Sequence, residues 1–254
     1  MSVAAADATA TFVLRCADDC FVLSHRLAQW SSQAPALEED VALTNIALDL
    51  LGQARALYAH VTELDGTGRS EDDYVFLRDE RDFVSCLLVE QENSDFAFTT
   101  VRQLLFSVYQ EELWAALAAS ADSQIAAVAA KSAKETAYHV DHAEHWTLRL
   151  GDGTEESHTR MQRALDALWP YSSELFESDA VTRGAAESGA GVDPATLRAS
   201  WEQRVSSSLQ AATLTVPPPT WKPNGGRQGL HTESFGYMVA EMQHLHRSHP
   251  GARW

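Results

Sequence analysis

Residues 38–65, EEDVALTNIALDLLGQARALYAHVTELD, decide the fold class, because their buried-type side chains recur every three or four positions. On a helix these positions form one stripe, which includes one glutamine and consists of Leu43, Ile46, Leu50, Gln53, Leu57, Val61 and Leu64. Three carboxylates open the pattern, where they favour the positive end of a helix, and Asp65-Gly66-Thr67-Gly68 stops it. At 1.5 Å per residue these 28 residues span about 42 Å. The stretch therefore predicts one long helix of a helical bundle.

The stretches on either side of this helix have the same period. We expect a first helix at about 11–31, a short helix near 78–88, and a third long helix from about Ser94. Asp122 is a suitable N-cap for a fourth long helix that continues to about residue 150. Together with the helix at 38–65, four long helices thus precede residue 150.

Further helical segments follow. Thr154 begins a fifth helix that Pro170 is expected to bend. Asp193-Pro194 is an N-cap followed by proline at the first helical position, which predicts a sixth helix. An extended arm without structure of its own is expected at 217–229, and a last helix at about 233–247.

The composition fits one large globular domain. A length of 254 residues, 45% of them hydrophobic, is enough to bury a sizeable core. No linker separates two independent patterns, so we expect a single all-α domain over residues 1–254. Its core bundle would occupy about 11–150, and added helices and the arm about 154–254.

The charge and the chain start exclude several classes of partner. Nineteen basic against 36 acidic side chains give 19 − 36 = −17, which repels phosphate backbones and anionic lipids, so neither nucleic acid nor a membrane is expected as a partner. Residues 1–11 lack the basic and apolar parts of a signal peptide, and we expect a cytoplasmic protein. Cys16 and Cys20 lie one helical turn apart in a chain with 3 cysteines, which indicates buried thiols.

Long bundles with polar interiors commonly hold two iron or manganese ions. Such a site takes a Glu from each of two helices and a Glu-x-x-His string from each of the other two. This sequence contains that string at Glu155 with His158 and at Glu241 with His244, both outside the first four helices. We interpret both as chance matches in a chain with 10 histidines.

The second and fourth helices offer only fragments of this ligand pattern. Asp49 and Gln53 are four residues apart, and an amide replaces the histidine. Glu135 also stands four residues before His139 rather than three, so the carboxylate is out of register. These four side chains predict a hydrogen-bonded polar cluster in the bundle interior.

Other histidines leave two interpretations open. His142 and His145 continue the row of His139, and this helix face could bind a soft divalent ion or simply pair with carboxylates; we favour the second. On the first helix His25 follows Asp18 by two turns, and a buried histidine satisfied by a carboxylate is the favoured interpretation. Motifs for phosphate binding, dinucleotide binding and serine hydrolysis do not occur.

Several runs along nearly the whole chain share a resemblance. They are LDLLGQAR at 48–55, RDER at 78–81, LLVEQ at 87–91, AKE at 133–135 with YH at 138–139, VDP at 192–194 with TLRA at 196–199, GLHTE at 229–233, MVAEMQ at 238–243 and PG at 250–251. In this order they closely resemble the C subunit family of the bacterial phenylacetyl-CoA 1,2-epoxidase. The resemblance implies a ferritin-like four-helix bundle with additional C-terminal helices.

The same resemblance implies a function and partners. The C subunits pair with a homologous catalytic A subunit that holds a di-iron centre and activates O₂. A reductase subunit passes electrons from NADPH, and the aromatic ring of phenylacetyl-CoA becomes an epoxide. By this resemblance the chain would be a non-catalytic structural subunit in phenylacetate catabolism, without a cofactor of its own.

The metal ligands of the catalytic A subunit fall on identifiable positions of this sequence. Its Asp-Glu-Ala-Gly-His motif falls on residues 49–53, where Leu50 replaces the Glu and Gln53 replaces the His. Its other ligands fall near His25, Ser107, Thr136 and His139, of which only His139 keeps its chemistry. We therefore expect a vestigial, structural cluster made of His25, Asp49, Gln53, Ser107, Glu135 and His139. The alternative is a self-sufficient ferritin-like metal-dependent oxidase that uses His25, Glu135, His139 and His142.

The segment from residue 221 to residue 232, called the arm from here on, is Gly-rich and flanked by prolines. Lys222 and Arg227 are among the few cations of this acidic chain. A segment with no apolar face of its own gains order mainly by docking on something else. Either the arm is a strap across the protein's own bundle, which we favour, or Lys222 and Arg227 contact the catalytic A subunit or the phosphates of CoA.

Overall fold

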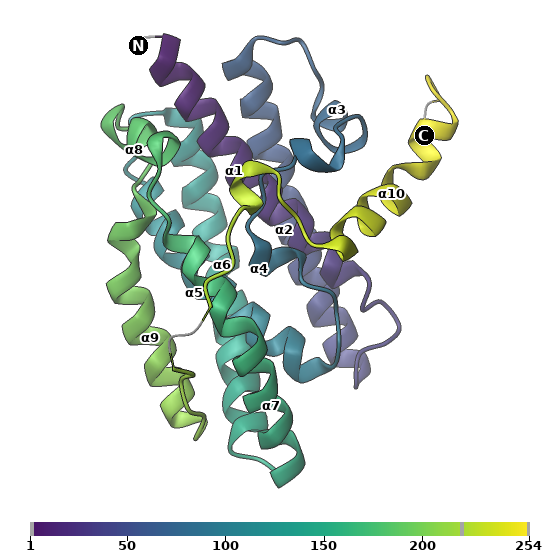
Figure 1. Cartoon of the computed structure of the whole chain (residues 1–254), viewed down its shortest axis with the longest axis vertical. Coiled ribbons are helices and arrows are strands. Elements are labelled where there is room, and N and C mark those ends of the chain that lie inside the picture. The colour runs from purple at the N-terminus through teal and green to yellow at the C-terminus, as the bar shows by residue number, and fades with distance from the viewer. Residues whose placement is uncertain (1–2, 219–220, 253–254) are drawn as a thin grey trace.

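The structure is a computed structural model that describes residues 3–218 and 221–252. The helical prediction is confirmed, since the ordered elements of this part of the chain are all helices (Figure 1). Pro219 and Thr220, which belong to the segment 217–229 predicted to be extended, lie outside the described residues, as does Trp254. Helices long and apolar enough to cross a membrane are absent from residues 3–218 and 221–252.

The long helices are α1 (Val3–Ala28), α2 (Leu37–Asp65), α5 (Phe96–Leu117) and α6 (Ser123–Gly151). α1 packs along α2, α5 packs along α6, and α2 contacts α6, which closes the bundle. The core fills the space between them with side chains such as Leu50, Leu105 and Trp114, each fully buried. The predicted N-cap is confirmed, because the Asp122 carboxylate accepts the first free backbone N–H groups of α6.

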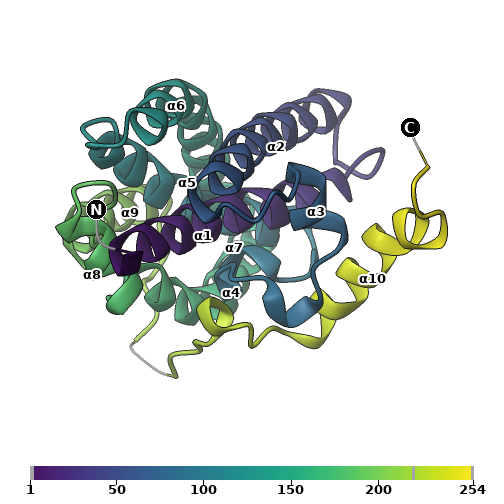
Figure 2. The ribbon, with the colours of Figure 1, turned by 90° about the horizontal axis from the view of Figure 1, so that it is seen from above.

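The remaining helices cover the bundle. α7 (Glu155–Leu168) and α9 (Arg198–Ala211) pack on α5 and α6, and α8 (Ala180–Glu187) packs on α1. α10 (Glu233–Ser248) contacts α3 (Glu71–Phe76) and lies at the edge of the molecule, away from the main bundle (Figures 1 and 2). The additional C-terminal helices that the sequence predicted are therefore present.

Two boundaries in the first half of the chain were predicted wrongly. α1 begins at Val3 rather than near residue 11, because residues 4–10 are mostly alanine, which favours helix without a large apolar side chain to mark it. The short helix expected at 78–88 is replaced by a 3₁₀ turn, η1 (Glu80–Asp82), and one turn of helix, α4 (Leu87–Glu90). Between these two elements, the backbone N–H groups donate to buried carboxylates of α1 instead of to helical carbonyls.

The second half departs from prediction at its prolines. α7 ends before Pro170, and 3₁₀ turns, η2 (Trp169–Phe176), take the place of a bent helix. Asp193 is an N-cap as predicted, but the turn that it opens, η3 (Pro194–Leu197), is 3₁₀, and α9 follows it. The sequence did not predict α8.

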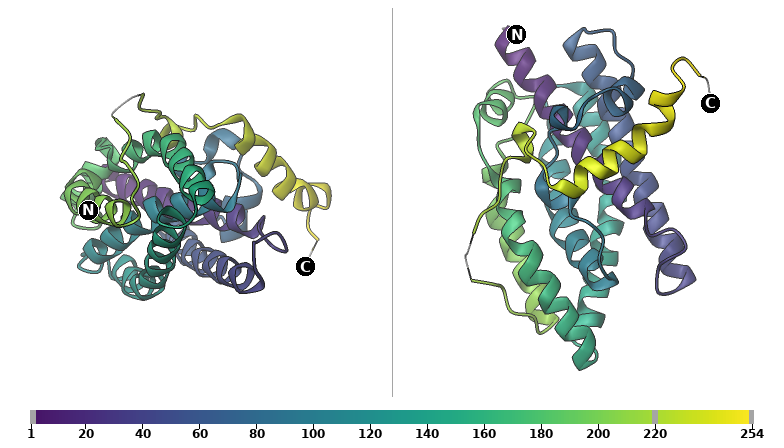
Figure 3. Two further views of the ribbon diagram at one scale, coloured as in Figure 1. Left: turned by 90° about the horizontal axis from the view of Figure 1, so that it is seen from below. Right: turned by 45° about the vertical axis from the view of Figure 1, so that its right-hand side comes forward.

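The arm is not structureless. It contains the 3₁₀ turn η4 (Gly226–Gln228) and runs over α1 before it joins α10 (Figure 3, right). The backbone requires glycine here, since Gly225 and Gly229 both have positive φ angles, of 115° and 75°.

Candidate functional site

A chain of hydrogen bonds through the bundle interior takes one polar side chain from each long helix. The Gln110 amide of α5 donates to the Cys20 sulfur of α1 at 3.2 Å, and that thiol donates to Gln53 Oε1 of α2 at 3.7 Å. The Gln53 amide in turn donates to Glu135 Oε2 of α6 at 3.1 Å. We call these four residues the interior polar chain. Of its members, Gln53 stands at a position on which the resemblance places a metal ligand, and Glu135 stands next to another such position, Thr136.

A second polar contact lies beside this chain. His139 Nε2 is 3.1 Å from Asp49 Oδ2, and burial lowers the pKa of His139 although Asp49 partly opposes the shift. His142 Nε2 is 2.8 Å from Glu39 Oε2, and His145 Nδ1 lies 2.8 Å from a carbonyl of its own helix. The structure therefore supports the interpretation that these histidines pair with nearby oxygen atoms.

The donor set of the interior does not fit a pair of hard metal ions. Such ions prefer carboxylates and imidazoles, whereas the interior polar chain offers two amides, a thiol and one carboxylate. Burial raises the pKa of Cys20 well above its usual value, so the thiol keeps its proton. Within the described ranges, no three His, Cys, Asp or Glu side chains are grouped closely enough to hold a metal ion.

Of the six expected cluster residues, His25 and Ser107 belong neither to the interior polar chain nor to the pair of Asp49 with His139. His25 is half-buried against Phe21, and the charges that act on its pKa, which burial lowers, are Arg26 and Glu241. Its expected partner Asp18 is bound elsewhere. In the described part of the molecule, the buried Ser107 hydroxyl has no hydrogen-bond partner. The side chains that α1 and α5 contribute to the interior polar chain are Cys20 and Gln110 instead.

Neither Glu-x-x-His string enters the bundle interior. His158 contacts the carbonyl oxygen of Gly151 through Nδ1 at 2.7 Å, and Glu155 is exposed. Glu241 and His244 are both exposed on α10. The interpretation of both strings as chance matches agrees with these positions.

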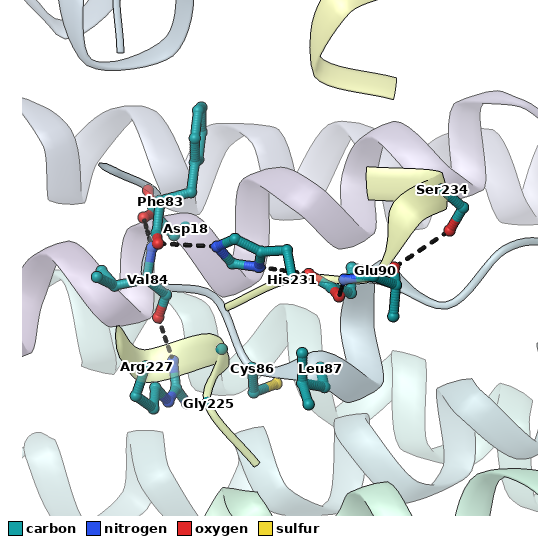
Figure 4. A network of polar contacts seen from close by, with 12 residues as sticks. Asp18, Phe83, Val84, Cys86, Leu87, Glu90, Gly225, Arg227, His231 and Ser234 are labelled. Carbon is teal, nitrogen blue, oxygen red and sulfur yellow. Dashed lines mark hydrogen bonds and ion pairs between the residues drawn. The ribbon is translucent and has the colours of Figure 1, made fainter. Parts of the chain in front are cut away.

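A second polar network joins the arm to the bundle (Figure 4). Arg227 donates to both carboxylate oxygens of Asp19, at 2.9 and 2.8 Å, and to the carbonyl oxygen of Val84 at 3.0 Å. The Arg227 side chain is 10% exposed and that of Asp19 is 5% exposed. Because the guanidinium of Arg227 is already bonded inside the protein, the geometry favours the strap; a contact of Arg227 with the catalytic A subunit or CoA stays a prediction. The favoured prediction, a strap across the bundle, is confirmed.

The end of the arm is held by a buried carboxylate. His231 Nδ1 lies 2.6 Å from Glu90 Oε2, and the backbone N–H of Thr232 donates to the other Glu90 oxygen at 2.7 Å. His231 Nε2 lies 2.9 Å from the carbonyl oxygen of Phe83. Figure 4 marks the polar contacts of His231 with dashed lines. Burial alone would lower the pKa of His231, but Glu90 outweighs it, and the pKa lies above its ordinary value of 6.5.

The middle of the arm is held by a third acid. The Glu174 carboxylate accepts from the backbone N–H groups of Gly225 and Gly226 at 3.0 and 2.8 Å, and from that of Leu87 at 2.6 Å. A Cβ at Gly226 would collide with the carbonyl oxygen of Ser85. Only glycine therefore fits at this contact between the arm and the segment before α4.

Asp18 completes this region. Its carboxylate accepts from Arg78 at 3.0 and 2.5 Å and from the Tyr58 hydroxyl at 2.6 Å, and its side chain is fully buried. Sequence reasoning missed Cys20, Gln110, Asp19 and Glu90 as polar residues of the interior. For two of them the helix position could have indicated a place in the interior, since Cys20 lies on the apolar stripe of α1 and Gln110 lies one turn after Ser107.

Lys222 differs from Arg227. It is exposed on the arm, near Trp221 and Arg198, at a surface cavity of about 180 Å³. The structure thus separates the two cations that the sequence had grouped. Of the two, Lys222 is the one that remains available for a contact outside this chain.

Comparisons with known proteins agree with the fold and the sequence resemblance. A family model described as phenylacetic acid catabolic protein matches residues 1–254. The chain is 47% identical over 243 residues to the C subunit of the 1,2-phenylacetyl-CoA epoxidase of Escherichia coli (strain K12), and the match covers 96% of this chain and 98% of that protein.

Among solved structures, "Protein 19 with aldehyde deformylating oxidase activity from Synechococcus" superposes with a TM-score of 0.57. The two sequences are 15% identical, and the match covers 84% of this chain and 93% of that one. At this identity the likeness shows the fold alone, which is a ferritin-like helical bundle.

Proposed function

The chain belongs to the phenylacetic acid catabolic protein family, and from that premise we propose that it is a structural, non-catalytic subunit of a multicomponent phenylacetyl-CoA 1,2-epoxidase. In this proposal the complex acts in aerobic phenylacetate catabolism in the cytoplasm. A homologous catalytic A subunit holds the di-iron centre, and a reductase subunit supplies electrons from NADPH. This chain holds no cofactor and supports the helices of the catalytic A subunit.

The observation that supports this role most strongly is the interior polar chain. Oxygen chemistry at two metal ions requires several charged or imidazole ligands at one place. The interior polar chain offers one carboxylate, that of Glu135, and otherwise the neutral Gln53, Gln110 and protonated Cys20, which are joined by hydrogen bonds. Such neutral side chains stabilise a packed interior and do not attract hard cations.

The arm network supports the same role. Four carboxylates, those of Asp18, Asp19, Glu90 and Glu174, fix the arm and the segment before α4 against α1. Buried charges that are paired and hydrogen-bonded in this way hold one arrangement of the backbone. Because these contacts hold the arm in one position, they leave a rigid surface on which a partner subunit can assemble.

Co-expression with the catalytic A subunit tests the proposal. We expect the two chains to co-elute in size exclusion chromatography at micromolar concentration, because obligate partners usually bury more than about 2,000 Å² between them. Omission of this chain should abolish or strongly reduce epoxidation of phenylacetyl-CoA by the catalytic and reductase subunits. Separate elution, together with full activity in the absence of this chain, would overturn the structural role.

Metal analysis tests the alternative of a self-sufficient oxidase. The protein is expressed in medium supplemented with iron and manganese, and its metal content is measured beside that of a Glu135→Ala, His139→Ala variant. We expect both proteins to contain far less than one ion per chain. Near-stoichiometric metal that the double substitution removes would refute the non-catalytic role.

A further inference from the structure

A surface cavity of about 180 Å³ lies between three segments that are far apart in the sequence. η2 lines one part of it, the beginning of α9 lines a second part, and the start of the arm lines the third. In Figure 1 the arm begins beside α9, on the opposite side of the molecule from α10. The cavity shares no residue with the interior polar chain, so it is a separate feature of the protein.

The walls of this cavity are largely aromatic. Trp169, Trp201 and Trp221, three of the chain's 7 tryptophans, line it together with Phe176, and we call it the tryptophan cavity. The ring centroid of Trp201 lies 5.6 Å from that of Trp169 and 5.0 Å from that of Phe176. Its indole N–H donates to the carbonyl oxygen of Leu105 at 2.9 Å. These three rings therefore form a fixed apolar wall, which favours a flat ring as its ligand.

Trp221 lines the cavity from the arm. It is 67% exposed, and its ring contacts the edge of Tyr171 at a centroid distance of 5.9 Å. Tryptophan side chains are highly buried on average. A ligand that covers this ring would remove from water apolar surface that the chain alone leaves exposed.

The lining also carries two cations, in a protein of net charge −17. Lys222 is exposed, and no polar group of residues 3–218 and 221–252 is paired with it. Arg198 is 42% exposed, lies over the Phe176 ring at 5.0 Å, and reaches the carboxylate of Glu202 only at 3.5 Å. Among the described residues that line the cavity, Glu202 is the one acid. Two cations against one carboxylate favour an anion with a single charge.

The volume sets the size of the ligand. An apolar cavity of about 150 Å³ holds one benzene molecule, whereas drug-sized ligands occupy about 300–1,000 Å³. At about 180 Å³, the tryptophan cavity has room for one ring with a small charged group. A nucleotide is too large for it, and a phosphate group, with a charge of about −1.5 to −2, matches its single excess positive charge less well than a carboxylate does.

We propose that the tryptophan cavity binds a small carboxylate that carries one flat ring. The ring lies against Trp169 and Trp201, where Trp221 covers it, and the carboxylate faces Lys222 and Arg198. The guanidinium fork of an arginine matches the two oxygen atoms of a carboxylate. This site goes beyond the proposed structural role, which assigns no ligand to the chain.

The test is a titration of the purified full-length chain with three probes, followed by calorimetry and tryptophan fluorescence. Benzoate has both the ring and the charge, benzamide has the ring alone, and acetate has the charge alone. We expect saturable binding of one benzoate per chain, with a Kd of about 1 mM or below for a ligand of this size. Benzamide and acetate should each bind at least about tenfold more weakly.

Two variants locate the binding site. Lys222→Ser removes the unpaired cation and Trp221→Leu removes the exposed ring, and circular dichroism shows that each variant is folded. Each should raise the Kd of benzoate at least about fivefold. Lys134→Ser removes an exposed lysine of α6, outside the tryptophan cavity, and is the matched control for Lys222→Ser. It should bind benzoate as wild type does.

Each possible outcome decides about the proposal. Failure of the wild type to bind benzoate saturably would overturn it, and so would unchanged affinity in both Lys222→Ser and Trp221→Leu. Acetate that binds as tightly as benzoate would indicate a simple anion site, and benzamide that binds as tightly would show that the cations do not take part; either result rejects the proposed ligand class. These titrations involve no other subunit, so their failure leaves the proposed function to its own tests.

Discussion

Arg227 and Lys222 lie on the same arm, yet removal of Arg227 is expected to cost much stability and removal of Lys222 almost none. Arg227→Met keeps much of the aliphatic volume and deletes the two bonds to Asp19 and the bond to Val84. It leaves the Asp19 carboxylate buried with one remaining donor, the backbone N–H of Cys86 at 2.8 Å. Lys222→Ser removes an exposed cation.

The magnitudes follow from these contacts. Removal of one partner from a buried ion pair costs about 3–5 kcal/mol, because the other charge stays buried without compensation. For a protein of this size that corresponds to a melting temperature lower by about 6–20 °C, at about 2–4 °C per kcal/mol. Lys222→Ser should change the free energy of unfolding by less than about 0.5 kcal/mol. Asp19→Asn in the Arg227→Met background should restore part of the loss, because it removes the unpaired charge.

Urea denaturation followed by tryptophan fluorescence gives the free energy of unfolding for the four proteins. Hydrogen exchange gives the local stability of the arm, through the amides of Gly225 and Gly226 that donate to Glu174. Both should lose protection in Arg227→Met and keep it in Lys222→Ser. A cost below about 1 kcal/mol for Arg227→Met, or an equal cost for Lys222→Ser, would refute the reasoning, since it would show that the Asp19 pair does not hold the arm.

Three further predictions concern single side chains. The pKa of His231 is raised in the folded state, so its pair with Glu90 stabilises fully below the ordinary value of 6.5 and loses this effect as pH rises through the raised value; urea titrations should show wild type losing stability relative to His231→Gln on the alkaline side, and parallel curves would contradict this. Glu135→Ala should cost about 1 kcal/mol, the lower end for a lost buried partner because the carboxylate is 20% exposed, and should leave the activity of the assembled complex unchanged; a large loss of turnover at unchanged melting temperature would disprove a structural role. Gly229→Ala should destabilise more than Gly66→Ala, because both have positive φ but only the first has backbone atoms in the way of a Cβ; equal melting temperatures would show that the arm yields freely.

The long helices could be predicted because their signals are local. The acids before α2, the glycine at its end and the Asp122 cap are read from a few neighbouring residues. Between η1 and α4 the backbone N–H groups donate to Asp18 and Asp19 instead, and these acids lie on a helix about 65 residues earlier. Periodicity within a window does not report such distant hydrogen bonds.

The candidate site was predictable in part for a related reason. Asp49, Gln53, Glu135 and His139 were identified because they depart from a known ligand pattern, and the structure joins them in two pairs. Cys20 was taken for an ordinary core residue. Its thiol links amides from α2 and α5, a role that depends on how the helices are rotated against each other. That rotation is a property of packing, which the period of one helix does not determine.

The burial of Arg227 could not be predicted from the sequence either. A cation in a Gly-rich segment without an apolar face is typical of a surface loop. Its partner Asp19 lies on α1, 208 residues earlier, and a composition argument cannot pair residues at that separation. The arm becomes ordered because three buried acids bind it. Asp19 pairs with Arg227, Glu90 pairs with His231, and Glu174 accepts from the glycine amides.

This pairing between the two ends of the chain has a consequence for biosynthesis. At about 5–20 residues per second, a ribosome that has made Asp19 needs about 10–40 s to deliver Arg227. During that time Asp19 of α1 and Glu90 of α4 lack Arg227 and His231, the partners with which they are buried, so their part of the core stays incomplete while the second half is being made. The chain is thus expected to complete its folding only after Arg227 and His231 have been made, and pulse-labelled nascent chains should stay protease-sensitive until then. A chain that stops before Arg227 would therefore keep the Asp19 carboxylate without its cation, and its core would be left incomplete.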